Sequence, residues 1–175
     1  MGDTVSFASG VWWILLACML GSRGADLFST WVATPTLLHE ANPVARWLGW
    51  RLAMPLNLAL CLGFAFFPLP AVIIATTSAL VAAHNFQKAW LMRSLGEEAY
   101  QFWHLQHLRA ASNSLFIGCL ALQHLLVTII GVILAWSVVD AQRVLLVPFG
   151  IGIGMITYAL TATFYTLLAF WRIRR

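Results

Sequence analysis

The stretch ADLFSTWVATPTLLHEANP, residues 25–43, decides the fold because it joins an apolar segment of bilayer length to a polar turn. It contains Asp26 and Thr30 near its start and Glu40, Asn42 and Pro43 at its end. Ionisable groups within a membrane segment are costly, usually face a protein interior and mark a functional site. We therefore expect a polar site beside this stretch, with the membrane segments of the chain arranged around it.

The composition of the whole chain predicts an integral membrane protein. Of the 175 residues, 61% are hydrophobic and only 9% are charged, whereas soluble proteins average about 45–50% apolar and about 25% charged residues. We expect one membrane domain over residues 1–175. Cys18, Cys61 and Cys119 lie within apolar runs, a pattern that indicates small hydrophobic residues and neither a disulfide framework nor a thiolate metal site.

Apolar runs of roughly 20 residues can cross the hydrocarbon core of a bilayer as helices. A longer apolar stretch is divided by the Phe67-Pro68-Leu69-Pro70 sequence, because proline removes a helical donor. The chain is therefore predicted to be an all-α, polytopic transmembrane helical bundle with five spans and a short interfacial helix. The expected spans are residues 11–34, 52–67, 70–92, 115–136 and 145–170, and the interfacial helix is expected over 95–112.

The basic residues indicate the orientation of these spans, because Lys and Arg gather in cytoplasmic segments. With the N-terminus outside and the C-terminus in the cytoplasm, eight of the ten basic residues lie on the inner side. The nine tryptophans fall at expected span ends or in connecting segments, where aromatic belts form. We expect a bacterial inner membrane protein, and we interpret the net charge of +4 as orientation and not as a nucleic-acid surface.

Polar residues inside the expected spans gather at one depth, towards the cytoplasmic side. Asp26 and Thr30 are four residues apart and share a helix face, and Arg23 lies one turn earlier, where it could neutralise Asp26. These groups could simply form interhelical hydrogen bonds, or they could line a cavity open to the cytoplasm. The residues predicted to bind a ligand there are Arg23, Asp26, Thr30, Glu40, Asn42, Asn57, His84, Asn85 and Lys88.

Asp26 and Thr30, followed by Glu40, Asn42 and Pro43, resemble the signature of a family of small bacterial and archaeal multi-span membrane domains of unknown function. The signature is Asp-x-x-x-Thr near the end of the first span and then Glu-x-Asn-Pro, and the resemblance covers about the first forty-five residues. It implies that these five residues matter, without assigning them chemistry, because the family has no settled activity.

The leading functional hypothesis is a non-enzymatic membrane protein that binds a small polar or anionic ligand, such as a lipid head group, or that forms a subunit of a larger membrane assembly. The alternatives are a membrane-embedded hydrolase or transferase, with Asp26 or Glu40 as acid/base and His84 as a further catalytic candidate, and a small transporter. The transporter is disfavoured because no inverted repeat is visible.

No cofactor and no metal are expected. Asp26, Glu40, His84, His104 and His107 are all possible metal ligands by chemistry, and His104 and His107 are the weak candidates because they lie on one side of a helix. The sequence contains no known metal motif. Membrane lipids are the expected partners. Gly150 and Gly154 form a G-x-x-x-G pair, which lets a helix approach closely, either within the bundle or in a homo-oligomer or another membrane complex.

Overall fold

The computed structural model describes residues 4–38, 40, 43–138 and 145–174, and within these ranges all regular secondary structure is α-helical. This confirms the predicted all-α class. The described helices are α1 (Gly10–Ala33), α2 (Pro43–Phe64), α3 (Pro68–Leu95), α4 (Glu97–Ala110), α5 (Asn113–Trp136) and α6 (Leu146–Arg174).

Four of these helices, α1, α3, α5 and α6, are long and apolar enough to cross a membrane. They support a multi-pass membrane protein. The segment expected as a further span over residues 52–67 is the second part of α2, which begins earlier and ends at Phe64, and α2 is not among the four.

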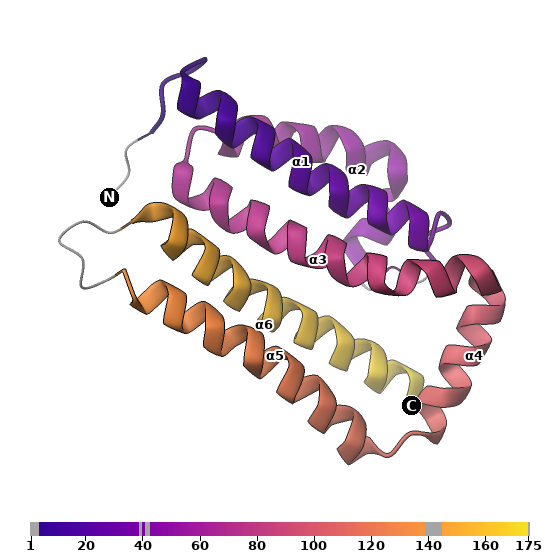
Figure 1. Ribbon diagram of the computed structural model, residues 1–175. Helices are drawn as coiled ribbons and strands as arrows, with labels where there is room; N and C mark the ends of the chain where they lie inside the picture. The colour runs from indigo at the N-terminus through magenta and orange to yellow at the C-terminus, as the bar shows by residue number, and fades with distance from the viewer. Residues whose placement is uncertain (1–3, 39, 41–42, 139–144, 175) are drawn as a thin grey trace.

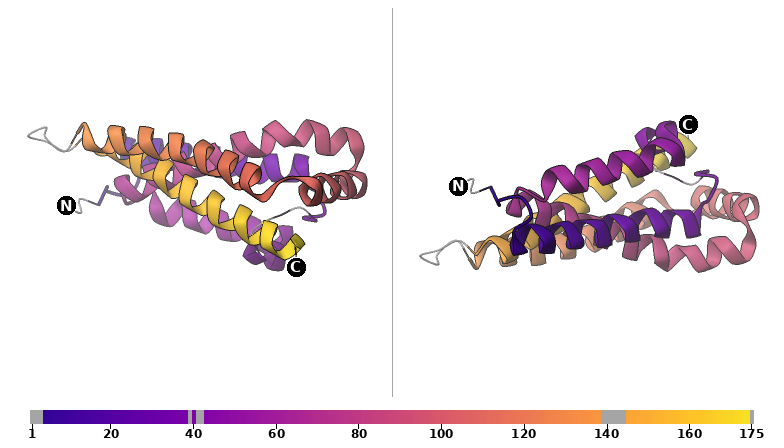
Figure 2. Two further views of the ribbon diagram at one scale, coloured as in Figure 1. Left: turned by 90° about the horizontal axis from the view of Figure 1, so that it is seen from below. Right: turned by 90° about the horizontal axis from the view of Figure 1, so that it is seen from above.

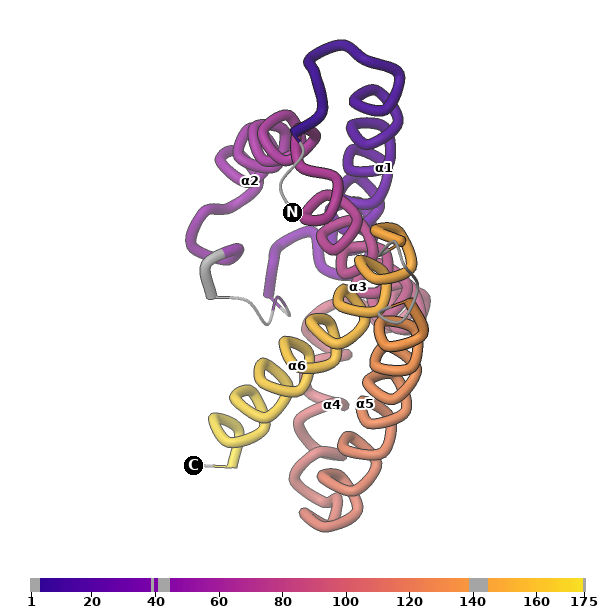
Figure 3. Tube along the Cα trace, turned by 90° about the vertical axis from the view of Figure 1, so that its left-hand side faces the viewer, coloured from indigo at the N-terminus to yellow at the C-terminus, as the bar shows by residue number. Residues whose placement is uncertain are grey.

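The long helices lie side by side, with the two chain ends at opposite ends of the bundle (Figure 1). In the view along the helices, α3 lies between α1 and α6, while α5 packs on α6 and α2 stands to one side (Figure 3). Helices α1 and α2 approach each other near the loop before α3 and diverge towards the end where α4 lies (Figure 2). The bundle is therefore tighter at one end than at the other.

Helix boundaries follow the capping and proline signals in the sequence. The Ser9 side chain accepts a hydrogen bond from the Trp12 backbone N–H at 3.2 Å and caps α1, as serine commonly does. Pro35 follows soon after α1 ends, and α3 begins at Pro68, where the missing backbone N–H of proline costs nothing. The proline-rich break predicted before residue 70 thus separates α2 from α3.

Helix α2 is interrupted and loosely packed. Gly49 has φ 60° and ψ 178°, outside the helical region, and Pro55 lies farther along the helix. The positive φ at Gly49 is one that glycine adopts readily. The tight contacts of α2 lie near its C-terminal end, where Cys61 and Ala65 pack in a cluster with Trp12, Leu16 and Met19 of α1.

Glycines let α5 and α6 approach each other closely. A Cβ placed on Gly131 would lie 2.8 Å from the Gly152 carbonyl oxygen, and one on Gly152 would lie 2.5 Å from the Gly131 carbonyl oxygen. Gly150 and Gly154 face the other way, against Val72 and Thr76 of α3. The predicted G-x-x-x-G pair thus packs within the chain, and alternate glycines place α6 between α3 and α5.

The short helix expected over residues 95–112 is α4, which crosses one end of the bundle (Figure 1). Tyr100 of α4 is buried against Ala33 of α1 and Ala89 of α3, and this burial raises the pKa of the phenol. At the far end of α4, the Arg174 guanidinium donates to the Leu108 carbonyl at 2.8 Å. Helix α4 thus joins the α1–α3 side of the bundle to α6.

Replacing Gly152 by alanine should destabilise the protein by about 1–3 kcal/mol, because the new methyl group would meet backbone atoms that cannot move aside. Gly118→Ala on α5 is the control, since a Cβ there meets nothing within 4 Å and alanine favours the helix. Thermal unfolding of the two variants in the same detergent measures the difference. Equal melting temperatures would contradict the close packing of α5 on α6.

Candidate functional site

A cavity of about 550 Å³ lies between α1, α2, α3 and α6, next to the segment that follows α1. Its volume falls in the usual range for small-molecule sites, about 300–1,000 Å³. Apolar and polar side chains both line it. The polar and ionisable residues are Arg23, Asp26, Thr30, Thr34, Glu40, Asn57, Thr77, His84, Asn85, Lys88, Tyr158, Thr161, Tyr165 and Thr166.

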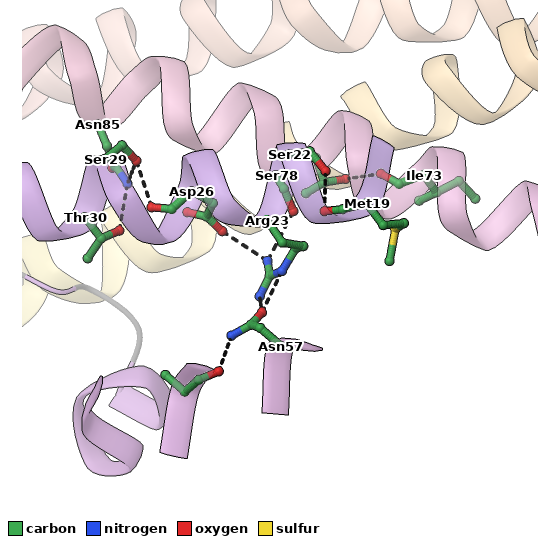
Figure 4. A network of polar contacts seen from close by, with 12 residues as sticks. Met19, Ser22, Arg23, Asp26, Ser29, Thr30, Asn57, Ile73, Ser78 and Asn85 are labelled. Carbon is green, nitrogen blue, oxygen red and sulfur yellow. Dashed lines mark hydrogen bonds and ion pairs between the residues drawn. The ribbon is translucent and has the colours of Figure 1, made fainter. Parts of the chain in front are cut away.

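Arg23 of α1 is the centre of the polar network in this cavity (Figure 4). Its Nη1 lies 3.0 Å from Asp26 Oδ2, one turn along the same helix, and donates at 3.1 Å to Ser78 Oγ on α3. Its Nε donates to Asn57 Oδ1 on α2 at 2.7 Å, and Nη2 donates to the same oxygen. One guanidinium therefore joins three helices, and the fork of donors that arginine carries makes this possible.

The ion pair with Arg23 holds the Asp26 carboxylate in place. Both side chains are partly shielded, with exposed fractions of 26% for Arg23 and 17% for Asp26. A charge left alone at this depth would be expensive, whereas a pair with further hydrogen bonds costs far less. The ion pair between Arg23 and Asp26 that the sequence suggested is thus present.

Asn57 is held so that its carbonyl oxygen faces Arg23. Its side-chain NH₂ donates to the Ala53 carbonyl of its own helix at 2.7 Å, and the residue is buried. An amide oriented in this way can only offer its oxygen to α1. This contact attaches the middle of α2 to α1 through polar groups (Figure 4).

A second set of bonds ties α1 to α3 one turn farther along. Asn85 Nδ2 lies 3.3 Å from Ser29 Oγ and 3.2 Å from Thr30 Oγ1. Ser29 is fully buried and also donates to the Asp26 carbonyl at 2.8 Å. These contacts are between neutral groups and hold the two helices in register. They stabilise the packing of α1 on α3 and involve none of the charged side chains of the cavity.

His84 and Lys88 form the opposite wall, one turn apart on α3. Lys88 Nζ lies 2.8 Å from His84 Nε2. An ammonium can only donate, so His84 accepts at Nε2 and carries its proton on Nδ1. Within the described part of the chain, Lys88 takes part in no ion pair. Lys88 lines the cavity.

One end of the cavity is lined by Thr34, Leu37 and Glu40, which follow α1. Trp50 Nε1 donates to the Pro35 carbonyl at 2.8 Å, which fixes the start of the continuous part of α2. Glu97, at the start of α4, accepts from Thr34 Oγ1 at 3.2 Å and also from Thr36. Glu40 lies in the same segment and lines the cavity. This end of the site is therefore tied to α4.

The structure brings together eight of the nine residues expected to form a ligand site. Arg23, Asp26, Thr30, Glu40, Asn57, His84, Asn85 and Lys88 all line the cavity. Asn42, the ninth, lies outside the described residues. The three residues considered for catalysis, Asp26, Glu40 and His84, are among those that line it.

Other polar residues from the sequence lie elsewhere. His104 stacks on the Tyr100 ring, and His107 Nδ1 lies 2.8 Å from the Trp103 carbonyl, both on α4 and away from the cavity. Across the described ranges, no group of three or more His, Cys, Asp or Glu side chains could hold a metal ion. His124 lies behind the cavity wall, with its ring 6.1 Å from that of Tyr158.

Sequence reasoning missed one complete wall and one anchor of the site. The wall is a single face of α6, where Tyr158, Thr161, Tyr165 and Thr166 recur at helical spacing. The anchor is Ser78, which lies seven residues before Asn85 and so on the same face of α3. Both could have been predicted from the sequence, because in each case polar residues recur on one face of an otherwise apolar helix.

We expect Arg23 and Asn57 to be energetically coupled, because their two hydrogen bonds form only when both side chains are present. A double-mutant cycle with Arg23→Lys, which keeps a cation for Asp26, and Asn57→Leu should give a coupling energy of about 1–2 kcal/mol. The free energy of unfolding in detergent is the quantity to measure. The matched cycle pairs Arg23→Lys with Asn85→Leu, which bonds other partners, and should be additive within about 0.5 kcal/mol. Equal coupling in both cycles would contradict the network.

None of the protein families, curated proteins or solved structures compared with this chain matches it. The resemblance of Asp26, Thr30, Glu40, Asn42 and Pro43 to a membrane-domain signature therefore stays a prediction. What the site can do is argued below from its geometry and charge alone.

Proposed function

We propose that the chain crosses the membrane five times as one domain, with its N-terminus outside and its C-terminus in the cytoplasm of a bacterial cell. The directions of the helices support this, because α2 runs back beside α1 and the two chain ends lie at opposite ends of the bundle (Figure 1). The basic residues Arg46, Arg93 and Arg172 then share the inner side. The positive-inside rule favours that arrangement.

The span that this proposal adds to the four long apolar helices is the continuous part of α2. From Trp50 to Phe64 it measures about 22 Å at 1.5 Å per residue, which is shorter than the hydrocarbon core of about 30 Å. Its C-terminal end packs level with the start of α1, through Cys61 and Trp12. The shortfall therefore lies on the cytoplasmic side, where Thr34, Leu37 and Glu40 line the cavity.

The function that this geometry supports best is the binding of a small anionic ligand from the cytoplasmic side. The observation that carries it is Lys88, an ammonium on the cavity wall that has His84 as its hydrogen-bond partner and forms no ion pair with the described carboxylates. Arg23 and Asp26 neutralise each other, so Lys88 is the cation available to a ligand. Binding is favoured over acid/base catalysis because Arg23 holds the Asp26 carboxylate.

The topology has a direct test in residues at the two ends of the bundle. Phe7, Phe67 and Arg172 are all exposed and can be replaced singly by cysteine in a variant without Cys18, Cys61 and Cys119. In intact cells, a membrane-impermeant maleimide should label position 7 and position 67 but not position 172. Labelling of positions 7 and 172 from the same side would contradict five spans, since an even number of crossings is required for that result.

The ligand proposal predicts that Lys88→Gln weakens the binding of an anion at least about tenfold. A hydrogen bond to a charged group contributes about 1.5–3 kcal/mol, and 1.4 kcal/mol corresponds to a factor of ten. The probe is sn-glycerol 3-phosphate, titrated into the detergent-solubilised protein and followed by calorimetry. Arg172→Gln is the control, because Arg172 is an exposed cation at the end of α6. An absence of saturable binding, or an equal loss in both variants, would contradict the proposal.

A further inference from the structure

Gln123 is a polar residue exposed near the middle of an apolar helix. It lies about 15 Å from Asn113 and about 20 Å from Trp136, the two ends of α5, at 1.5 Å per residue. Within the described ranges its side chain makes no hydrogen bond. A carboxamide has two N–H donors and an acceptor oxygen. In the hydrocarbon core of a membrane these groups are costly without partners, because no water is present to bind them.

The face of α5 that carries Gln123 is not covered by the rest of the bundle. Helix α5 lies along one edge of the bundle (Figure 1), and its backbone approaches that of α6 and of no other described helix. The side towards α6 carries His124, Gly131 and Ala135, which are buried. Gln123 precedes His124 and is therefore rotated by about 100° from it around the helix. This face is free to meet a helix of another molecule.

Gln123 is part of a stripe of exposed residues along α5, which we call the α5 seam. Its members recur at alternating intervals of four and three residues and are Cys119, Gln123, Leu126, Ile130 and Ile133. All five are exposed, and the three aliphatic members are 62%, 55% and 63% exposed in that order. A repeat of 3.5 residues keeps one stripe facing a partner helix in a left-handed pair. Most helix pairs in membranes cross in this way.

A second copy of this chain is the partner that fits the α5 seam. Copies of one chain insert in the same orientation, because each follows the same distribution of basic residues. A two-fold axis along the membrane normal then places two α5 helices in parallel, with Gln123 of one beside Gln123 of the other. Each carboxamide offers both a donor and an acceptor, so the two satisfy each other. One polar residue in an apolar seam also fixes the register of a helix pair.

We propose that the chain forms a parallel homodimer through the α5 seam, in which the two Gln123 side chains hydrogen-bond to each other. This interface goes beyond the proposed function, because none of the seam residues lines the cavity. It also differs from the contact expected at Gly150 and Gly154, which pack against α3 within the chain.

Cross-linking between copies tests the position of the seam. A variant without Cys18 and Cys61 keeps Cys119 as its single cysteine. Oxidation of membranes with copper phenanthroline should join two copies, since facing Cα atoms in a tight helix pair fall within the range of about 4.4–6.8 Å that a disulfide spans. In a cysteine-free background, Leu126→Cys should also cross-link. Leu125→Cys is the matched control, because Leu125 is exposed on the same helix but lies outside the seam.

The strength of association tests the hydrogen bond between the glutamines. Gln123→Leu should raise the dissociation constant of the dimer at least about tenfold, measured by sedimentation equilibrium in a density-matched detergent. Tenfold corresponds to about 1.4 kcal/mol, and polar contacts between membrane helices contribute energies of this order. Gln123→Asn keeps the carboxamide and should retain most of the affinity. Thermal unfolding checks that both variants fold, as expected for substitutions at an exposed position.

The outcomes separate the homodimer from chance contact and from other arrangements. Equal cross-linking at positions 125 and 126 would indicate random collisions and would overturn the proposal. A chain that stays monomeric at every concentration and does not cross-link at positions 119 and 126 would also overturn it. If Gln123→Leu and Gln123→Asn weaken the dimer equally, or if neither weakens it, the pairing of the two carboxamides is wrong.

Discussion

The guanidinium of Arg23 is the interaction on which the rest of this structure depends. It neutralises Asp26 on its own helix and reaches Ser78 on α3 and Asn57 on α2. In a membrane the attraction between apolar helices is weak, since lipid tails are as apolar as leucine. Polar groups and close backbone contacts must therefore hold the helices together. Arg23 does this for α2, while glycines do it for the packing of α6 on α3 and α5.

The cavity follows from the way α2 is attached. Its C-terminal end is packed against Trp12 and Leu16, its middle is held by Asn57, and its N-terminal part turns away at Gly49. Helix α2 therefore closes the bundle at one end and stands apart from α6 at the other (Figure 3). The space left between them is walled by the side chains of α1 and α3 that carry the charges.

The sequence predicted the helical class and singled out eight of the polar residues that line the cavity, and the reasons can be traced to single residues. Asp26, Asn57, His84 and Lys88 are costly in apolar segments, so their shared depth implied a common site. The wall on α6 was not predicted, because Tyr158 and Tyr165 resemble ordinary interfacial or packing residues when only their depth in the membrane is considered.

The start of α2 and its interruption could not be predicted from the sequence, for a different reason. The start of α2 at Pro43 and its interruption at Gly49 depend on tertiary contacts, notably that of Trp50 with the Pro35 carbonyl. A glycine in an amphipathic stretch allows such a break without requiring it. Likewise, the apolar hollow lined by Ala59, Leu60, Gly63 and Phe64 also needs Phe67 from the connection after α2, and periodicity within one segment does not predict a wall shared by two segments.

In the proposed function, the structural role and the binding role belong to two different cations of the cavity, Arg23 and Lys88. Arg23 donates hydrogen bonds to α2 and α3. Substitutions of Arg23 or Asp26 therefore disturb the helix packing, and a change in ligand binding in such variants would not identify a binding residue. Lys88 is attached to its own helix through His84, and its loss leaves the contacts among α1, α2 and α3 in place. With two separate cations, a ligand can pair with Lys88 while the contacts of Arg23 between the helices stay in place. Binding and helix packing then do not compete for the same charge. The contacts that hold the cavity together are thereby separate from Lys88, the charge proposed to bind the ligand.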